Sequence, residues 1–151
     1  MWQDRTLFKM NVKLVLIGSD GKIKLVRYGK NMVVNTGLAH IADQLSSSPG
    51  GAAMSHMAVG SGTTATSGAT TTLETELGRV ALSSRTDAGA VVTYVATFPA
   101  GTGTGALTEA GILNNSSGGS LLCRLVYDVI NKGASDALQV TWTLTGADDG
   151  V

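Results

Sequence analysis

The chain has 151 residues, with 11 acidic and 11 basic side chains and a formal net charge of zero. Charged residues make up 15%, well below the usual share of about a quarter. The chain therefore lacks the basic field that would hold nucleic acid or an anionic membrane. Its one cysteine, Cys123, excludes an internal disulfide and a metal site built from cysteines. At 43% hydrophobic but only 5% aromatic, the composition favours one β-rich domain with an aliphatic core.

The first 28 residues predict an N-terminal arm followed by a β-hairpin. Apolar residues alternate imperfectly over residues 6–17, a turn falls at 19–21, and Lys22 and Lys24 alternate along a return strand. The opening MWQDRTLFKM carries charges where a signal peptide needs apolar residues, and no run approaches the ~18 residues of a membrane span. We expect folding in a cytoplasm, with residues 1–28 as arm and hairpin and 29–151 as the body of one domain.

An amphipathic helix is predicted to begin at residues 35–37. Leu38, Ile41, Ala42 and Leu45 recur at the spacing of one helical face, and the serine- and glycine-rich stretch 46–51 ends the pattern. We expect this face to cover the sheet, with Leu38 as a core anchor.

The stretch 54–84 predicts a short strand, a glycine-rich surface loop and a one-turn helix. Thr71 and Glu74 have the spacing of a capping box, and Gly78 could close the carbonyl end of the turn. Residues 72–77 are therefore predicted to be helical, with Leu73 and Leu77 as anchors in the core.

The remaining sequence predicts two hairpins and a final strand. Residues 80–82 and 91–98 are predicted to pair across a turn at 86–89, and 107–112 with 121–130. The last strand has the clearest period of two, shown by Leu138, Val140, Trp142 and Leu144. These elements predict an antiparallel β-sandwich or jelly-roll-like single domain with one amphipathic helix.

The candidates for chemistry are few. Neither His40 nor His56 has a cysteine or carboxylate at ligand spacing, and the glycine loop at 60–64 lacks the Gly-Lys-Ser/Thr ending and long helix of a phosphate-binding loop. No nucleophile, base and orienting group can be assembled from two histidines and one cysteine. We therefore expect no catalytic activity, no metal and no cofactor.

Glu109 stands in a strand that is otherwise too apolar for a free charge, LTEAGI. A carboxylate in such a place needs a cationic partner. We expect an ion pair with Arg79 or Arg85.

Four short motifs resemble those of tailed-bacteriophage virion proteins: NTGL followed by IA, MAVGSGTT, TLETELGR and LTEAGI, which begin at Asn35, Met57, Thr72 and Leu107. The resemblance covers roughly residues 30 to 145 and leaves out the N-terminal hairpin. It implies a small β-sandwich protein that either cements the capsid shell from outside or belongs to a tail fibre or baseplate.

We therefore expect a non-enzymatic virion structural protein, made in the bacterial cytoplasm. The first hypothesis is a capsid cement protein, a homotrimer that binds the major capsid protein and neither nucleic acid nor membrane. The alternative is a tail-fibre or baseplate component that binds another tail protein or a host glycan. Lysines along the hairpin discourage indiscriminate strand pairing, so we expect a specific contact with acidic residues of a partner. The expected interface residues are Trp2, Arg5, Phe8, Lys9, Lys13, Lys22 and Lys24.

Overall fold

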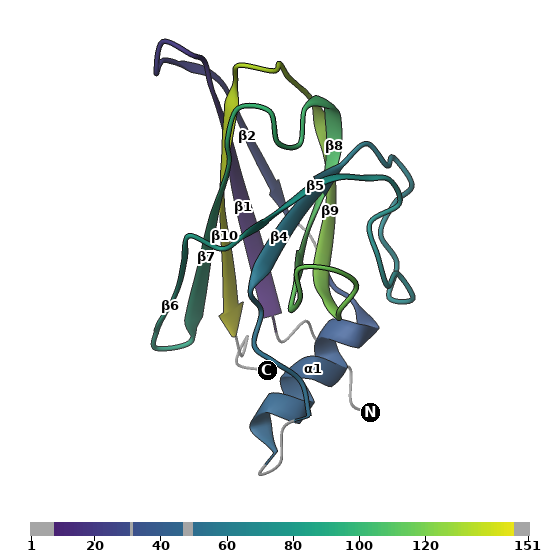
Figure 1. The fold of residues 1–151 in the computed structure, drawn as a ribbon. Helices are drawn as coiled ribbons and strands as arrows, with labels where there is room; N and C mark the ends of the chain where they lie inside the picture. Colours follow the sequence, from purple (N-terminus) through teal and green to yellow (C-terminus); the bar gives the residue numbers. More distant parts are fainter. Residues whose placement is uncertain (1–7, 31, 47–49, 147–151) are drawn as a thin grey trace.

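The computed structural model describes residues 8–30, 32–46 and 50–146, which form two five-stranded sheets packed face to face (Figure 1). Sheet A contains β1 (Phe8–Ile17), β2 (Ile23–Lys30), β6 (Ser84–Ala88), β7 (Val91–Phe98) and β10 (Ala137–Gly146), in the order β2-β1-β10-β7-β6. Sheet B contains β3 (Met32–Val33), β4 (His56–Gly60), β5 (Glu76–Ala81), β8 (Gly105–Leu113) and β9 (Leu121–Lys132), in the order β3-β9-β8-β4-β5. Each pair of neighbouring strands is antiparallel, and the one helix, α1, spans Asn35–Leu45. The predicted antiparallel β-sandwich with one helix of several turns is confirmed.

The core lies between the two sheets and is built mainly from aliphatic side chains. In β10, Leu138, Val140, Trp142 and Leu144 are buried, as their period of two predicts, and Cys123 of β9 is buried too. Trp142 is among the largest fully buried side chains. Alternation along a strand is therefore enough to identify the inward face of β10.

The N-terminal hairpin forms as predicted, with β1 and β2 joined at a turn in which Gly21 has a φ of 78°. Its first strand is not an edge, because β1 also pairs with β10 along its whole length, from Phe8 opposite Gly146 to Ile17 opposite Ala137. The apolar side chains of Val12, Leu14 and Leu16 are buried in the sandwich core. The chain thus covers this apolar run by itself.

The predicted second hairpin has the right return strand but the wrong first strand, and its turn falls at residues 89–90 and not at 86–89. Residues 80–82 do not pair with β7: β5 belongs to sheet B, and β6 is the strand that pairs with β7 across a turn in which Gly89 has a φ of 58°. The chain changes sheets between them, where Leu82 N–H donates to the Ser55 carbonyl and Ser83 N–H to the Val95 carbonyl. The hairpin predicted from residues 107–112 and 121–130 is confirmed as β8 and β9.

The predicted one-turn helix at residues 72–77 is wrong, because residues 72–75 form bends without a helical turn and β5 begins at Glu76. Gly78 closes no helix: a Cβ there would lie 2.7 Å from the Gly103 nitrogen, so glycine is needed for a close approach of two backbones. Leu73 is buried as expected, but Leu77 is 43% exposed and is no core anchor.

The predicted helix exists as α1, but it lies at one end of the sandwich and not over a sheet face (Figure 1). Its first turn makes the contact: a Cβ at Gly37 would lie 2.1 Å from the Leu122 carbonyl oxygen, and the Thr36 hydroxyl donates to the Leu121 carbonyl at 2.7 Å. Leu38 is 46% exposed and Leu45 is 84% exposed. The prediction that Leu38 anchors the helix in the core is therefore wrong: Thr36 and Gly37 make the close contacts of this turn, and Ile41 is the residue of the predicted stripe that packs against the core.

Candidate functional site

A long loop over residues 61–75 lies against the outer face of sheet B, next to β8. Leu73 of this loop belongs to a second, smaller cluster of buried apolar side chains, completed by Val34, Ala58, Leu113 and Leu121. Leu73 packs directly on the β8 backbone at Gly111. Glycine is needed there, because a Cβ would lie 2.7 Å from the Cδ1 atom of Leu73. The loop therefore adds a thin second core to the sandwich.

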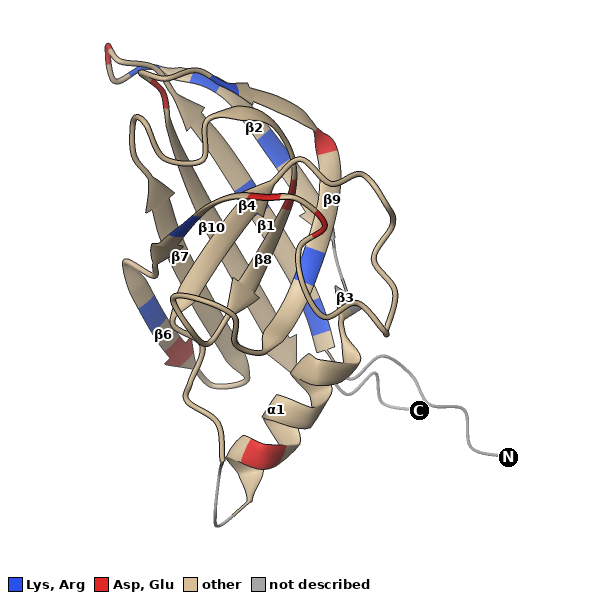
Figure 2. Ribbon diagram, turned by 45° about the vertical axis from the view of Figure 1, so that its right-hand side comes forward, with Lys and Arg blue, Asp and Glu red and all other residues tan. Residues whose placement is uncertain are grey.

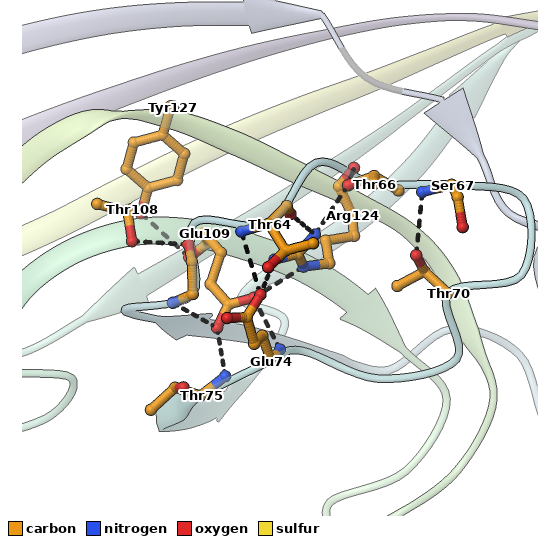
Figure 3. A network of polar contacts seen from close by, with 11 residues as sticks. Thr64, Thr66, Ser67, Thr70, Glu74, Thr75, Thr108, Glu109, Arg124 and Tyr127 are labelled. Carbon is orange, nitrogen blue, oxygen red and sulfur yellow. Dashed lines mark hydrogen bonds and ion pairs between the residues drawn. The ribbon is translucent and has the colours of Figure 1, made fainter.

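The loop is held by Glu109, which projects from β8 and is fully buried (Figure 3). Its Oε1 atom accepts hydrogen bonds from the backbone N–H groups of Gly62 at 2.9 Å and Thr75 at 2.7 Å. Its Oε2 atom accepts from the Glu74 N–H at 2.9 Å and from Arg124 Nε at 2.8 Å. Each carboxylate oxygen thus has two donors, and both ends of the loop meet at one side chain.

Arg124 extends the same network from β9. It is 2% exposed in its side chain, and its Nη1 atom donates to the Thr64 carbonyl at 2.7 Å and to the Thr66 hydroxyl at 3.1 Å. Glu74 adds an outer contact, because its Oε2 atom lies 3.7 Å from Arg124 Nη2 and accepts from the Thr64 N–H at 3.1 Å. We call Glu109, Arg124 and the loop groups that they bind the loop clamp.

The ion pair of Glu109 was predicted with the wrong partners. Arg79 binds Glu76, with Nη2 to Oε1 at 2.6 Å, and Arg85 donates to the Met54 carbonyl. The true partner, Arg124, gives the same signal in the sequence as Glu109 does, a single charge inside an apolar strand, LLCRLVY. Pairing these two isolated charges across the predicted hairpin of 107–112 and 121–130 would have suggested the ion pair, but not the strand register or the loop groups of the clamp.

The clamp keeps Glu109 ionised. Burial by itself would raise the pKa of this carboxyl, but hydrogen bonds from the N–H groups of Thr75, Glu74 and Gly62 and from Arg124 outweigh burial and lower the pKa below its usual value. Tyr127 donates its hydroxyl to the Glu109 carbonyl at 3.2 Å, and burial, reinforced by the Glu109 charge, raises the pKa of that phenol. A saturated carboxylate with a lowered pKa is suited to fixing a loop and unsuited to proton transfer at neutral pH.

The histidines and carboxylates outside the clamp form no metal centre: within residues 8–30, 32–46 and 50–146, no three His, Cys, Asp or Glu side chains are grouped so that they could hold an ion. His56 shares a 2.8 Å hydrogen bond with the Ser55 hydroxyl through Nδ1. In the described chain, no helix is both long enough and apolar enough to cross a membrane.

The described members of the predicted interface all belong to β1, β2 and the turn between these strands. Lys9 and Lys13 are exposed on the outer face of sheet A, because they alternate with buried residues of β1. Lys22 lies in the turn, and Lys24 binds Asp136, with 3.1 Å from Nζ to Oδ1. Phe8 is half-buried against the core, and the predicted residues Trp2 and Arg5 lie outside the described residues.

Phe8 lines a cavity of about 350 Å³ between α1 and the adjoining ends of β1, β7 and β10. The wall is mainly apolar, with Ile41 from the helix and Val92 and Leu144 from sheet A. Sequence reasoning missed this cavity, because it exists only where the helix and three distant strands end together.

Comparisons of the chain with models of protein families, with curated proteins and with solved structures found no match.

Proposed function

We propose that the protein is a non-enzymatic structural component of a tailed-phage virion, and that it acts as a capsid cement protein, a homotrimer bound to the major capsid protein. The observation that carries the proposal is the convergence of the resembling motifs on the loop clamp. MAVGSGTT supplies Gly62, TLETELGR supplies Glu74 and Thr75, and LTEAGI supplies Glu109. Three of the four motifs are thus parts of one structural unit, so the resemblance bears on a connected part of the fold.

The chemistry of the clamp favours a structural role. Each of its carboxylate oxygens is occupied by donors of the same chain, and the resulting charge pair is buried. Such a network fixes a backbone and leaves little for a substrate to bind. A protein that must keep its shape while it is attached to a shell needs this kind of rigidity.

The outer face of sheet A is the surface best suited to contact with a shell. Along β7 and β10, the side chains on this face are valine, threonine, glutamine and alanine, and β1 adds Lys9 and Lys13. Among the described strands of sheet A, the alternation places no acidic side chain on the outer face. A flat, weakly charged face with basic groups along one side fits a protein partner with acidic groups.

Immunogold labelling of purified phage particles tests the proposal. Antibody raised against this chain is applied to particles encoded by the same genome, and the gold is located by electron microscopy. The cement hypothesis predicts label over the head at many regular positions. Label confined to the tail or baseplate would favour the appendage hypothesis and contradict the cement role, and particles without label would contradict a virion location.

A further inference from the structure

Strand β2 is an open edge of sheet A. It pairs with β1 on one side only, and no strand among the described residues pairs with its other side. The inner face of β2 contacts β9 near the end of the strand, because a Cβ at Gly29 would lie 2.8 Å from a methyl of Leu125. Residues 23–27 precede this contact, and as part of an edge strand they present backbone N–H and C=O groups to a further strand.

The edge is basic along its length. Figure 2, with Lys and Arg in blue, shows basic residues along β2 and the hairpin that it forms with β1. The strand IKLVRYGK contains three basic residues and no acidic one. Lys24 is compensated by Asp136. Arg27 has no ion pair within the described part of the chain, and its Nε atom is buried without a hydrogen-bond partner.

An unpaired guanidinium N–H that is buried is costly, and a carboxylate is its preferred acceptor. Apolar contact is also available on β2, since Ile23 is 65% exposed and Tyr28 is 73% exposed. Open backbone groups, an uncompensated cation and exposed apolar side chains thus occur together on one short strand.

We propose that β2 accepts an extended acidic segment of a partner protein, which adds to sheet A as a sixth strand and places a carboxylate against Arg27. A second copy of this chain is disfavoured as the occupant, because two β2 strands would bring like charges opposite each other. This inference deepens the proposed function by giving the chemistry of the partner, and it depends on that function only for the partner's identity.

The test is an NMR titration of the full chain, labelled with ¹⁵N, with a short peptide in which glutamate alternates with valine. A matched peptide has glutamine in place of every glutamate. We expect amide shifts in residues 23–27, with the opposite edge strand β6 unchanged as an internal control. The glutamate peptide should bind about tenfold more tightly than the glutamine peptide, and high salt should remove the difference.

Variants of the chain assign the effect to Arg27. Arg27→Gln should weaken binding of the glutamate peptide about tenfold, whereas Arg79→Gln, which removes one positive charge from β5 of sheet B, should change it less than about twofold. Melting temperatures establish that both variants fold. If Arg27→Gln does not fold, the comparison of the two peptides on the unaltered chain still decides.

Three results would overturn the inference: equal shifts in β6, no preference for the glutamate peptide, or an Arg27→Gln variant that folds and binds normally. Self-association through β2, detected by sedimentation, would assign the edge to a second copy instead. Gold label on phage heads with a negative titration would reject this inference alone, and a positive titration without label would reject the virion role alone.

Discussion

Glu109 is the residue on which the loop clamp depends, because it accepts four hydrogen bonds and pairs with a buried arginine. Glu109→Gln would turn one acceptor atom into a donor and leave Arg124 without its charge partner. We expect a loss of about 3 to 5 kcal/mol in the free energy of unfolding, the range for breaking a buried pair. Denaturant unfolding measures it.

The matched control is Glu76→Gln, which removes the exposed ion pair with Arg79. We expect a change of about 0 to 1 kcal/mol there. Equal effects of the two substitutions would show that the clamp contributes no more than a surface pair.

The lowered pKa of Glu109 also predicts an acid limit to stability. A carboxyl with a lower pKa in the folded state stabilises the fold fully above its unfolded pKa of about 4.3, and this contribution is lost as the pH falls through the folded pKa. Asp136 acts in the same direction, because hydrogen bonds from the Gly133 backbone and from Lys24 lower its pKa. The melting temperature should therefore decrease as the pH is lowered below about 4. The decrease should be less steep in the Glu109→Gln variant than in the unaltered protein. A parallel pH dependence in the variant would exclude Glu109 as a source.

At the scale of single residues, the sequence indicated that Glu109 needs a cation but not which one. Arg79 pairs with Glu76 and Arg85 donates to the Met54 carbonyl, whereas Arg124 lies opposite Gly111 in the β8–β9 ladder. Register, which fixes that neighbour, depends on the β-bulges in this ladder and could not be derived from composition or periodicity.

Among the chain's elements, the loop that carries Leu73 should matter more than the helix that carries Leu38. Leu73→Ala removes a buried side chain of the smaller cluster, and we expect a loss of about 2 to 5 kcal/mol. Leu38→Ala and Leu77→Ala, at half-exposed positions, should each cost less than about 1 kcal/mol. The unfolding midpoints of the three variants rank the losses in stability. A larger loss for Leu38→Ala than for Leu73→Ala would contradict the half-exposed position of Leu38.

Helix α1 is attached through Gly37, where the usual effect of glycine in a helix should reverse. Replacing a helical glycine with alanine normally stabilises a helix by about 1 kcal/mol. Here the new methyl would meet the Leu122 carbonyl at 2.1 Å, so Gly37→Ala should destabilise the protein by about 1 to 3 kcal/mol and speed amide exchange in α1. Ala42→Gly, at an exposed site of the same helix, is the control, with a loss of about 1 kcal/mol. A more stable Gly37→Ala variant would contradict the attachment.

Period-two alternation predicted most strands because each has one face in the core. The capping-box pattern was misleading at residues 72–77, because the Glu74 N–H donates to Glu109 and not to a residue of its own turn. The alternation failed at Leu82, because nothing local marks the change of sheet. Both errors come from tertiary contacts that override local preference.

For the whole molecule, the cement proposal predicts that attachment depends on the basic side of sheet A. A double variant, Lys9→Gln with Lys13→Gln, removes two positive charges from the outer face without touching the core. We expect lower occupancy on purified heads and a weaker dependence of binding on salt. Quantitative gel analysis of sedimented heads measures occupancy.

The control for net charge is Ser116→Glu with Ser117→Glu, in the exposed turn between β8 and β9. It makes the same change of two charges on another part of the surface and should leave occupancy unaltered. If both double variants bind alike, the contact is not on the outer face of sheet A.

The pairing of β1 with β10 has a consequence for how the chain reaches its native state. The first described strand lies in the middle of sheet A, yet its neighbour on one side is the last described strand, from Phe8 opposite Gly146 onward. During synthesis, β1 and β2 leave the ribosome early. The pairing of β1 with β10 can form only after almost the whole chain has been made, so the apolar face of β1 stays incompletely covered until then. Contacts so distant in sequence make folding slow and expose unfinished chains to aggregation. Translation that stops before β10 should therefore give insoluble fragments, so that only chains that include β10 are available to assemble.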